Sequence, residues 1–160
     1  MLVLSFLFPG ATAYSQNESR GKSIIVLDAS GSMWGQINGE AKIDIAKQVV
    51  SDLLSTLDPS IELGLLAYGH RRKGDCTDIE LLISPGKVDR QAFAEVVQGI
   101  SPKGKTPLTD AVEQAARHLK YEEAPADVIL VSDGIETCDK DPRELARMLA
   151  ATGVRFRFHR

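Results

Sequence analysis

The sequence lacks several features that mark large classes of proteins. Only two cysteines occur in its 160 residues, Cys76 and Cys138, and their spacing matches no metal-binding motif. A strong charge of one sign is also missing, because 19 basic and 22 acidic residues leave a formal net charge of −3. A protein that holds nucleic acid through a basic field needs the opposite balance, so we expect no nucleic-acid partner. No apolar run reaches the roughly 18 residues that cross a bilayer, and we expect no membrane span in this chain.

The N-terminal segment differs from the rest of the chain. Residues 1–13 are mostly apolar and end in Ala-Thr-Ala, as the apolar core and cleavage site of a secretory signal peptide do. A basic leader is missing, so a frayed apolar terminus or a buried first strand is the alternative. We favour export because a polar spacer follows, and we expect a secreted or periplasmic protein. We assign the signal peptide and spacer to residues 1–21 and one domain to residues 22–160.

Strand and helix patterns alternate along this domain, which predicts an α/β fold with a doubly wound, mostly parallel sheet and helices on both faces. Only ten residues separate the second and third expected strands, so these two should be antiparallel, with the third at a sheet edge. A doubly wound domain usually continues beyond a fifth strand, and we expect the domain to be incomplete at its C-terminal end. The expected strands cover residues 24–27, 61–68, 79–83, 127–131 and 154–159, and the expected helices cover residues 43–57, 90–100, 108–119 and 142–152.

Oxygen-bearing side chains follow two of these strands. The first strand ends in Asp28-x-Ser30-x-Ser32, Asp133 follows the fourth strand, and Thr106 precedes a helix. In doubly wound folds ligands bind outside the carboxyl ends of the strands, so these side chains should lie close together. Carboxylate and hydroxyl oxygens suit a hard divalent cation such as Mg²⁺. Taken singly, each residue has a simpler role: a turn for the aspartates and serines, or a helix cap for Thr106.

This pattern resembles the von Willebrand factor type A (VWA) family, and in particular its secreted bacterial members. The family builds a metal-ion-dependent adhesion site (MIDAS) from Asp-x-Ser-x-Ser, a threonine and a second aspartate. The matching residues, in the same order and at similar intervals, are Asp28, Ser30, Ser32, Thr106 and Asp133. The resemblance covers residues 22–160 and implies a Rossmann-like VWA fold. It also implies a bound Mg²⁺, with Mn²⁺ and Ca²⁺ as alternatives, that grips an Asp or Glu carboxylate of a partner protein.

Further residues near this motif are candidates for binding and for cross-linking. Met33 and Trp34 directly follow the motif and are candidates for an apolar contact with the partner, although Trp34 has the alternative of packing under the loop. Cys76 and Cys138 fall in loops at the same end of the predicted sheet, so a disulfide is expected there, with two free thiols as the alternative. The basic residues 71–73 are expected to form a solvated loop rather than to steer an acidic partner.

We expect that this chain is not an enzyme, but two other functions remain open at this point, one of them enzymatic. VWA domains also serve as accessory subunits of chelatase and ATPase complexes inside cells. The chain has no phosphate-binding Gly-x-x-x-x-Gly-Lys-Ser/Thr loop, so an ATPase would be a separate protein. Asp28 could alternatively be the nucleophile of a phosphoaspartate-type hydrolase. That class needs a second aspartate two residues later, where this chain has Ser30.

Overall fold

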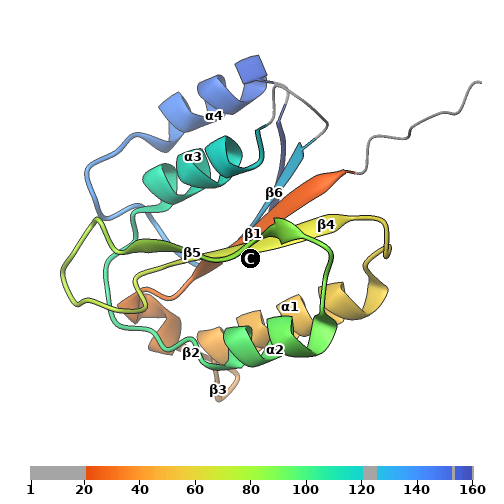
Figure 1. The fold of residues 1–160 in the computed structure, drawn as a ribbon. Coiled ribbons are helices and arrows are strands. Elements are labelled where there is room, and N and C mark those ends of the chain that lie inside the picture. Colours follow the sequence, from red (N-terminus) through yellow and green to blue (C-terminus); the bar gives the residue numbers. More distant parts are fainter. Residues whose placement is uncertain (1–20, 121–125, 153, 160) are drawn as a thin grey trace, which may run out of the picture.

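The computed structural model describes residues 21–120, 126–152 and 154–159. Of the segment expected to be a signal peptide and spacer, residues 1–20 lie outside the described residues. A five-stranded sheet forms the centre of the described chain, and its strands lie in the order β5–β4–β1–β6–β7 (Figure 1). The strands are β1 (Lys22–Asp28), β4 (Glu62–Tyr68), β5 (Ile79–Gly86), β6 (Ala126–Val131) and β7 (Arg155–His159).

The pairing of the strands confirms the predicted mostly parallel sheet. β1 lies between β4 and β6 and is parallel to both, and β7 is parallel to β6. β5 is antiparallel to β4 and forms one edge of the sheet, as its short connection predicts. It runs three residues further than expected, through Pro85, which an edge strand tolerates. The pairing shifts register opposite Gly64, where a Cβ atom would lie 2.9 Å from the carbonyl oxygen of Ile83.

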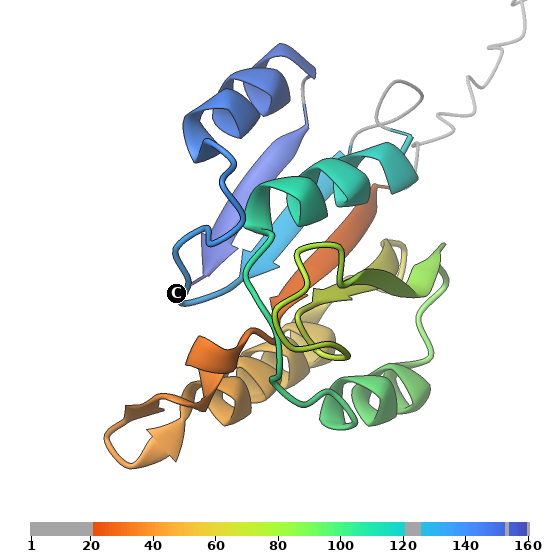
Figure 2. The same cartoon turned by 90° about the vertical axis from the view of Figure 1, so that its left-hand side faces the viewer.

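Helices cover both faces of the sheet (Figures 1 and 2). On one face lie α1 (Lys42–Thr56) and α2 (Arg90–Gln98), and on the other lie α3 (Leu108–His118) and α4 (Pro142–Thr152). Successive residues of a strand point to opposite faces, so Ile25 packs toward α1 and α2 whereas Val26 packs toward α3. β1 is buried on both faces, which explains its continuous apolar sequence. In the described part of the chain, no helix is long and apolar enough to span a bilayer.

The segment between β1 and α1 was expected to be a loop, and the structure corrects this. A short 3₁₀ helix, η1 (Gly31–Trp34), follows the Asp-x-Ser-x-Ser motif. A hairpin of β2 (Gln36–Ile37) and β3 (Glu40–Ala41) comes next and projects beside the start of α1 (Figure 2). Its turn residues Asn38 and Gly39 have φ angles of 53° and 87°. Asn-Gly is the preferred sequence for such a two-residue hairpin turn, so the signal was present in the sequence.

Candidate metal site

Three loops meet at the carboxyl ends of the parallel strands, the end of the sheet onto which Figure 2 looks. Backbone hydrogen bonds join them: the Gly31 N–H donates to the Gly104 carbonyl (2.9 Å), and the Lys103 N–H donates to the Ala29 carbonyl (3.1 Å). Gly104 has no room for a side chain, because a Cβ atom there would lie 2.6 Å from the Arg72 carbonyl oxygen. The loop after β1 and the segment before α3 are therefore held at a fixed separation.

Asp28 is fully buried at the base of this rim, and the chain holds both of its oxygens. The Ser30 N–H donates to Oδ1 (2.8 Å), and the Ser132 hydroxyl donates to Oδ2 (2.5 Å). The same hydroxyl accepts from Tyr68 (3.2 Å) and from the Gly134 N–H (2.9 Å). Burial, and secondly the charge of Asp28, raise the pKa of Tyr68 well above its ordinary value, so Tyr68 stays a donor. The carboxylate is thus oriented by neutral groups.

The other four predicted metal ligands line one open pocket of about 510 Å³ above Asp28. The hydroxyl oxygens of Ser30 and Ser32 lie 3.0 Å apart, and Ser32 donates to Oδ1 of Asp133 at 3.2 Å. Thr106 enters from the segment before α3, and its backbone N–H donates to Thr137 Oγ1 at 2.8 Å. A Cβ atom on Gly134 would lie within 3.0 Å of both Thr106 and Asp28, so these two residues approach the same glycine. The structure therefore brings together residues from three loops.

The loop after β6 that carries Asp133 is anchored at several further points. Glu136 accepts from the backbone N–H groups of Thr109 and Cys138, both at 2.8 Å. The expected disulfide between Cys76 and Cys138 is present in the structure, with the two Cα atoms 5.7 Å apart. It ties this loop to the loop after β4. One of the segments that line the pocket is therefore cross-linked to a neighbouring loop.

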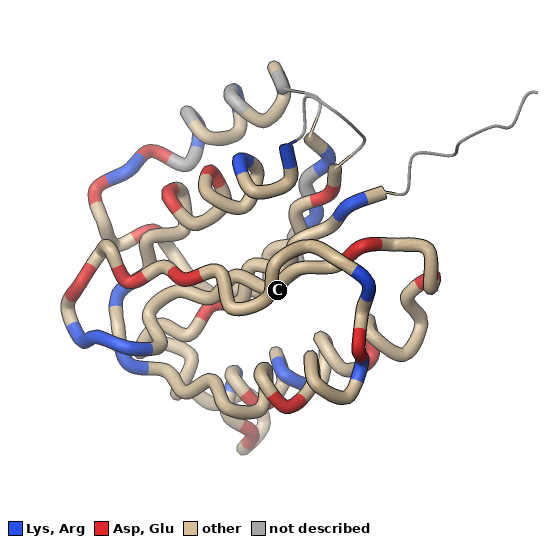
Figure 3. Tube along the Cα trace, in the orientation of Figure 1, with Lys and Arg blue, Asp and Glu red and all other residues tan. Residues whose placement is uncertain are grey.

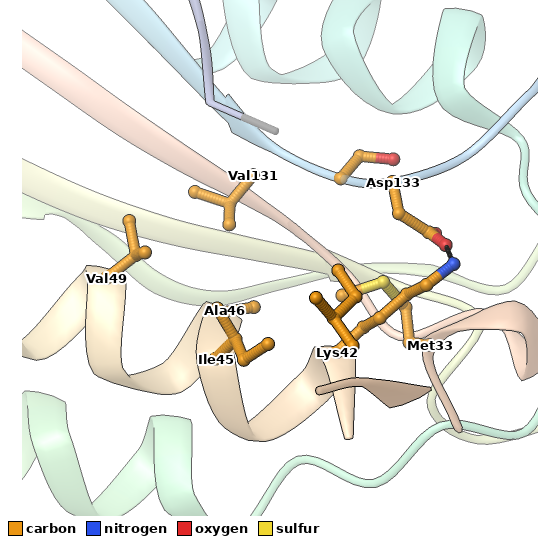
Figure 4. Close-up of a pocket in the computed structure, with 9 residues that line it drawn as sticks. Met33, Lys42, Ile45, Ala46, Val49, Val131 and Asp133 are labelled. Carbon is orange, nitrogen blue, oxygen red and sulfur yellow. Dashed lines mark hydrogen bonds and ion pairs between the residues drawn. The ribbon is translucent and has the colours of Figure 1, made fainter. Parts of the chain in front are cut away.

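Sequence reasoning missed one charged neighbour of the pocket. Lys42, the first residue of α1, forms an ion pair with Oδ2 of Asp133 (Figure 4). The two residues are 91 positions apart in the sequence, and nothing in their local patterns connects them. The role of Ser132 as the donor to Asp28 was also missed, although its position at the end of β6 was a usable signal.

The two residues predicted to contact a partner lie in different environments. Met33 is only 2% exposed and packs in the core with Ile43 and Ala46, so its prediction as a surface contact is wrong. The 3₁₀ turn points its side chain inward. Trp34 is 56% exposed, and its indole N–H donates to the Pro102 carbonyl (3.0 Å), so it does not pack under the loop. Its contact with a partner stays a prediction.

The chemistry of these side chains fits a hard cation. Two carboxylates and three hydroxyls offer oxygen atoms only, the type of ligand that Mg²⁺ and Ca²⁺ prefer and soft metals do not. Among the described residues, no three His, Cys, Asp or Glu side chains gather into a metal-binding cluster. A metal at this rim would therefore depend on the hydroxyls of Ser30, Ser32 and Thr106 as well as on the aspartates.

Comparison with known proteins assigns the family. Residues 23–136, most of the chain, match the model of the von Willebrand factor type A domain, so this chain belongs to the VWA family. A relative from Bacillus subtilis (strain 168), YwmD, is 28% identical over 163 residues, which cover 96% of this chain and 72% of YwmD.

Two solved structures share the fold. Proximal thread matrix protein 1 (PTMP1) from the mussel byssus superposes with a TM-score of 0.66 at 20% identity, over 87% of this chain and 35% of PTMP1. The vWF domain of the type V pili tip protein Mfa5 from Porphyromonas gingivalis gives a TM-score of 0.57 at 18% identity, over 72% of this chain and 38% of that chain. This chain therefore spans well under half of each solved chain, and at these identities the likeness shows the fold.

Proposed function

We propose that this protein is a secreted binding module that grips an acidic residue of a partner protein through a divalent metal ion, with Mg²⁺ as the first candidate. The observation that carries the proposal is the convergence of Ser30, Ser32, Thr106 and Asp133 on one open pocket above the buried Asp28. PTMP1, which shares the fold, has been solved with a zinc-occupied MIDAS motif. That likeness supports a divalent metal at the corresponding end of this sheet.

The chain's own residues divide into two groups in this proposal. The first group, Ser30, Ser32 and Thr106, would offer neutral hydroxyl oxygens to the ion. The second group, Asp28 and Asp133, would supply the negative charge of the site. A bound Mg²⁺ would supply a positive charge that attracts an oxygen atom of a partner. The hydrogen bonds from Ser30 and Ser132 hold Asp28 in one orientation, so the pocket needs little rearrangement to accept the ion. In this proposal none of the five residues is given the role of a nucleophile or of a proton donor or acceptor, so the proposed activity is binding rather than catalysis.

The surface around the pocket suits an acidic partner with an apolar neighbour. Ile135 lines the pocket and is 85% exposed, and Trp34 is exposed on the η1 side. Aromatic residues are enriched at protein–protein interfaces, which makes the exposed Trp34 the candidate for an apolar contact. Lysines and arginines of the loop after β4 and of the segment before α3 gather at the same end of the molecule (Figure 3). Within the loop after β4, Arg71 is paired with Asp78 and Glu80, and Arg72 with Asp75, so attraction for a negatively charged partner would come mainly from Lys103 and Lys105 before α3.

The proposed location and the alternatives follow from the same features. A disulfide persists in an oxidising compartment, which supports a secreted or periplasmic protein and argues against an accessory subunit of an intracellular chelatase or ATPase. The pilus tip protein Mfa5, which shares the fold, supports a surface role. A phosphoaspartate-type hydrolase needs an acid at position 30, where the hydroxyl of Ser30 instead lies 3.0 Å from that of Ser32.

The proposal is tested by titrating the purified protein with Mg²⁺ and following thermal unfolding. A ligand at about one hundred times its Kd stabilises the folded state by about 2.7 kcal/mol, so the unfolding temperature of the wild type should rise. Thr106→Val, which removes one hydroxyl at nearly constant volume, should weaken the response, and Asp28→Asn should abolish it. Asp52→Ala, which removes an exposed carboxylate on α1, is the control and should respond like the wild type.

A partner is then sought by pull-down from the native source with Mg²⁺ or with EDTA. Proteins retained by the wild type with Mg²⁺, and lost with EDTA or with Thr106→Val, would be the partners. The proposal fails if Mg²⁺, Mn²⁺ and Ca²⁺ all leave the wild-type unfolding temperature unchanged. Turnover of a generic phosphomonoester that Asp28→Asn removes would instead favour the hydrolase.

A further inference from the structure

Asp133 faces two different partners with its two carboxylate oxygens. Oδ1 accepts from the hydroxyl of Ser32, which lines the candidate metal pocket, at 3.2 Å. Oδ2 is paired with the ammonium group of Lys42 (Figure 4). The lysine is not one of the residues that line the candidate metal pocket, yet its charge lies directly beside one of the two aspartates.

The chain holds Lys42 in this position by packing. Its backbone N–H donates to the Gly35 carbonyl (2.9 Å), and a Cβ atom on Gly35 would lie 3.3 Å from its Cε. Its stem lines an apolar pocket of about 270 Å³ together with Met33, Ile45 and Val131 (Figure 4). The β2–β3 hairpin returns the chain so that α1 begins at the rim. Lys42 is therefore part of the architecture of the site, whereas most surface lysines are mobile.

A sum of formal charges shows what this position does. Asp28 and Asp133 together carry −2, and Lys42 reduces the charge of the metal-free site to −1. A divalent ion would change it to +1. Without the lysine the same two states would carry −2 and 0. The lysine thus opposes the arrival of a cation, and it leaves the loaded site positive, which attracts an anion.

We propose that Lys42 is the resident counter-cation of this site: it lowers the affinity for the divalent metal and raises the affinity of the metal-loaded site for a carboxylate. The proposal rests on the function proposed above and concerns the division of binding energy between metal and partner. A residue that only supported the fold would change both affinities in the same direction. Opposite changes are therefore the signature of a counter-cation.

The test is Lys42→Met, which keeps an unbranched apolar stem and removes the charge. Mg²⁺ binding is measured by calorimetry. Carboxylate binding is measured with acetate as the probe, from the relaxation of its methyl protons by Mn²⁺ on protein saturated with that ion. We expect the Kd for Mg²⁺ to fall by about tenfold, the effect of a unit charge on a divalent ion ~6 Å away when water fully screens the interaction. The charge of acetate is half that of the metal ion in magnitude and opposite in sign, so the Kd for acetate should rise by roughly threefold.

Two further variants make the result specific. Lys47→Met removes the same charge from the same helix, where the ammonium group donates to the Gln98 carbonyl (3.0 Å), and should change neither constant. Lys42→Arg keeps the charge and should remain near the wild type. The inference is overturned if Lys42→Met weakens both ligands together or changes neither while the wild type binds Mg²⁺. A wild type that takes up none of Mg²⁺, Mn²⁺ and Ca²⁺ overturns the proposed function, and this inference with it.

Discussion

Two buried carboxylates lie at the same end of the sheet and are treated differently by the chain. Asp28 and Asp78 are both fully buried. Asp78, just before β5, accepts from the guanidinium of Arg71 (2.7 Å) and from the backbone N–H groups of Arg71 and Arg72 (both 2.8 Å). Asp28, at the end of β1, accepts from a backbone N–H and the Ser132 hydroxyl, both neutral groups.

This difference separates a carboxylate with a structural role from one that can bind an outside cation. Burial alone would raise the pKa of Asp78, but the hydrogen bonds from Arg72 and Arg71 outweigh it and lower that pKa below its ordinary value. The charge of Asp78 is thus compensated within its own loop by Arg71, which is exposed, as expected for this loop, and also paired with Asp78. A carboxylate held by neutral donors keeps its attraction for an outside cation. The comparison teaches that the partners of a buried aspartate distinguish a structural role from a binding role.

The largest loss of stability is expected on removing the disulfide between the loop of Asp78 and the candidate metal site. The Cys76–Cys138 disulfide joins the loop of Asp78 to the loop of Asp133, across 62 positions of sequence. In the chain-entropy model, closing a loop of this length stabilises the folded state by about 4 kcal/mol. The double variant Cys76→Ser/Cys138→Ser should therefore unfold at a clearly lower urea concentration. Equal urea midpoints for the variant and the oxidised wild type would contradict this expectation.

The next largest loss of stability tests the structural role of Asp78. Asp78→Asn replaces a charged acceptor of three hydrogen bonds by a neutral group that also presents N–H donors, which should cost about 3 kcal/mol at neutral pH. The free energy of unfolding from urea titrations measures this loss. The variant should keep the Mg²⁺ response of the wild type, in contrast to Asp28→Asn. A lost Mg²⁺ response in a folded Asp78→Asn protein would erase the distinction between the two aspartates.

The pH dependence of the same variant follows from the sign of the pKa shift. Because the pKa of Asp78 is lower in the folded state, its contribution is fully present above the unfolded pKa of about 3.9. It is lost as the pH falls through the lower folded value. The stability gap between the wild type and Asp78→Asn should thus be constant from pH 5 upward, on the order of 3 kcal/mol, and should close only in stronger acid. If the stability difference between the wild type and Asp78→Asn disappeared near pH 6, the titration of a group other than Asp78 would be responsible.

Much of the site could be predicted from the sequence because its residues are tied to strand ends. The apolar runs before Asp28 and Asp133 predicted two central parallel strands, and parallel strands bring their carboxyl ends to one rim. The short connection before β5 predicted its antiparallel direction. These inferences depend only on local pattern and on the length of the connections.

The features that were missed depend on contacts between distant residues. The Lys42–Asp133 ion pair spans 91 positions and requires the β2–β3 hairpin to return α1 to the rim. The inward orientation of Met33 depends on a single 3₁₀ turn, which the pattern of polar and apolar residues does not encode. The hydrogen bond from Ser132 to Asp28 forms between two side chains that are 104 positions apart in the sequence. The hairpin had a local signal, the Asn-Gly turn, and Ser132 had its position directly after β6.

The smallest expected effect tests the neutral donors that surround Asp28. Tyr68→Phe removes the hydroxyl that donates to Ser132 but keeps the ring, so it should cost about 1 kcal/mol at pH 7. Because the pKa of Tyr68 is raised in the folded state, the wild type should lose stability as the pH rises above the unfolded value of about 10. The phenylalanine variant cannot lose that contribution, so the gap should narrow and then reverse in alkali.

Urea titrations at neutral and at alkaline pH measure this crossing. Ser132→Ala is the matched control, because it removes the acceptor of the Tyr68 hydroxyl and the donor to Asp28 but keeps the titrating phenol. It should show the alkaline loss of the wild type, on top of a larger loss at neutral pH. Parallel curves for the wild type and Tyr68→Phe across this range would mean that Tyr68 ionises as readily in the folded as in the unfolded chain. That result would contradict the claim that Asp28, unlike Asp78, is surrounded by buried, neutral groups.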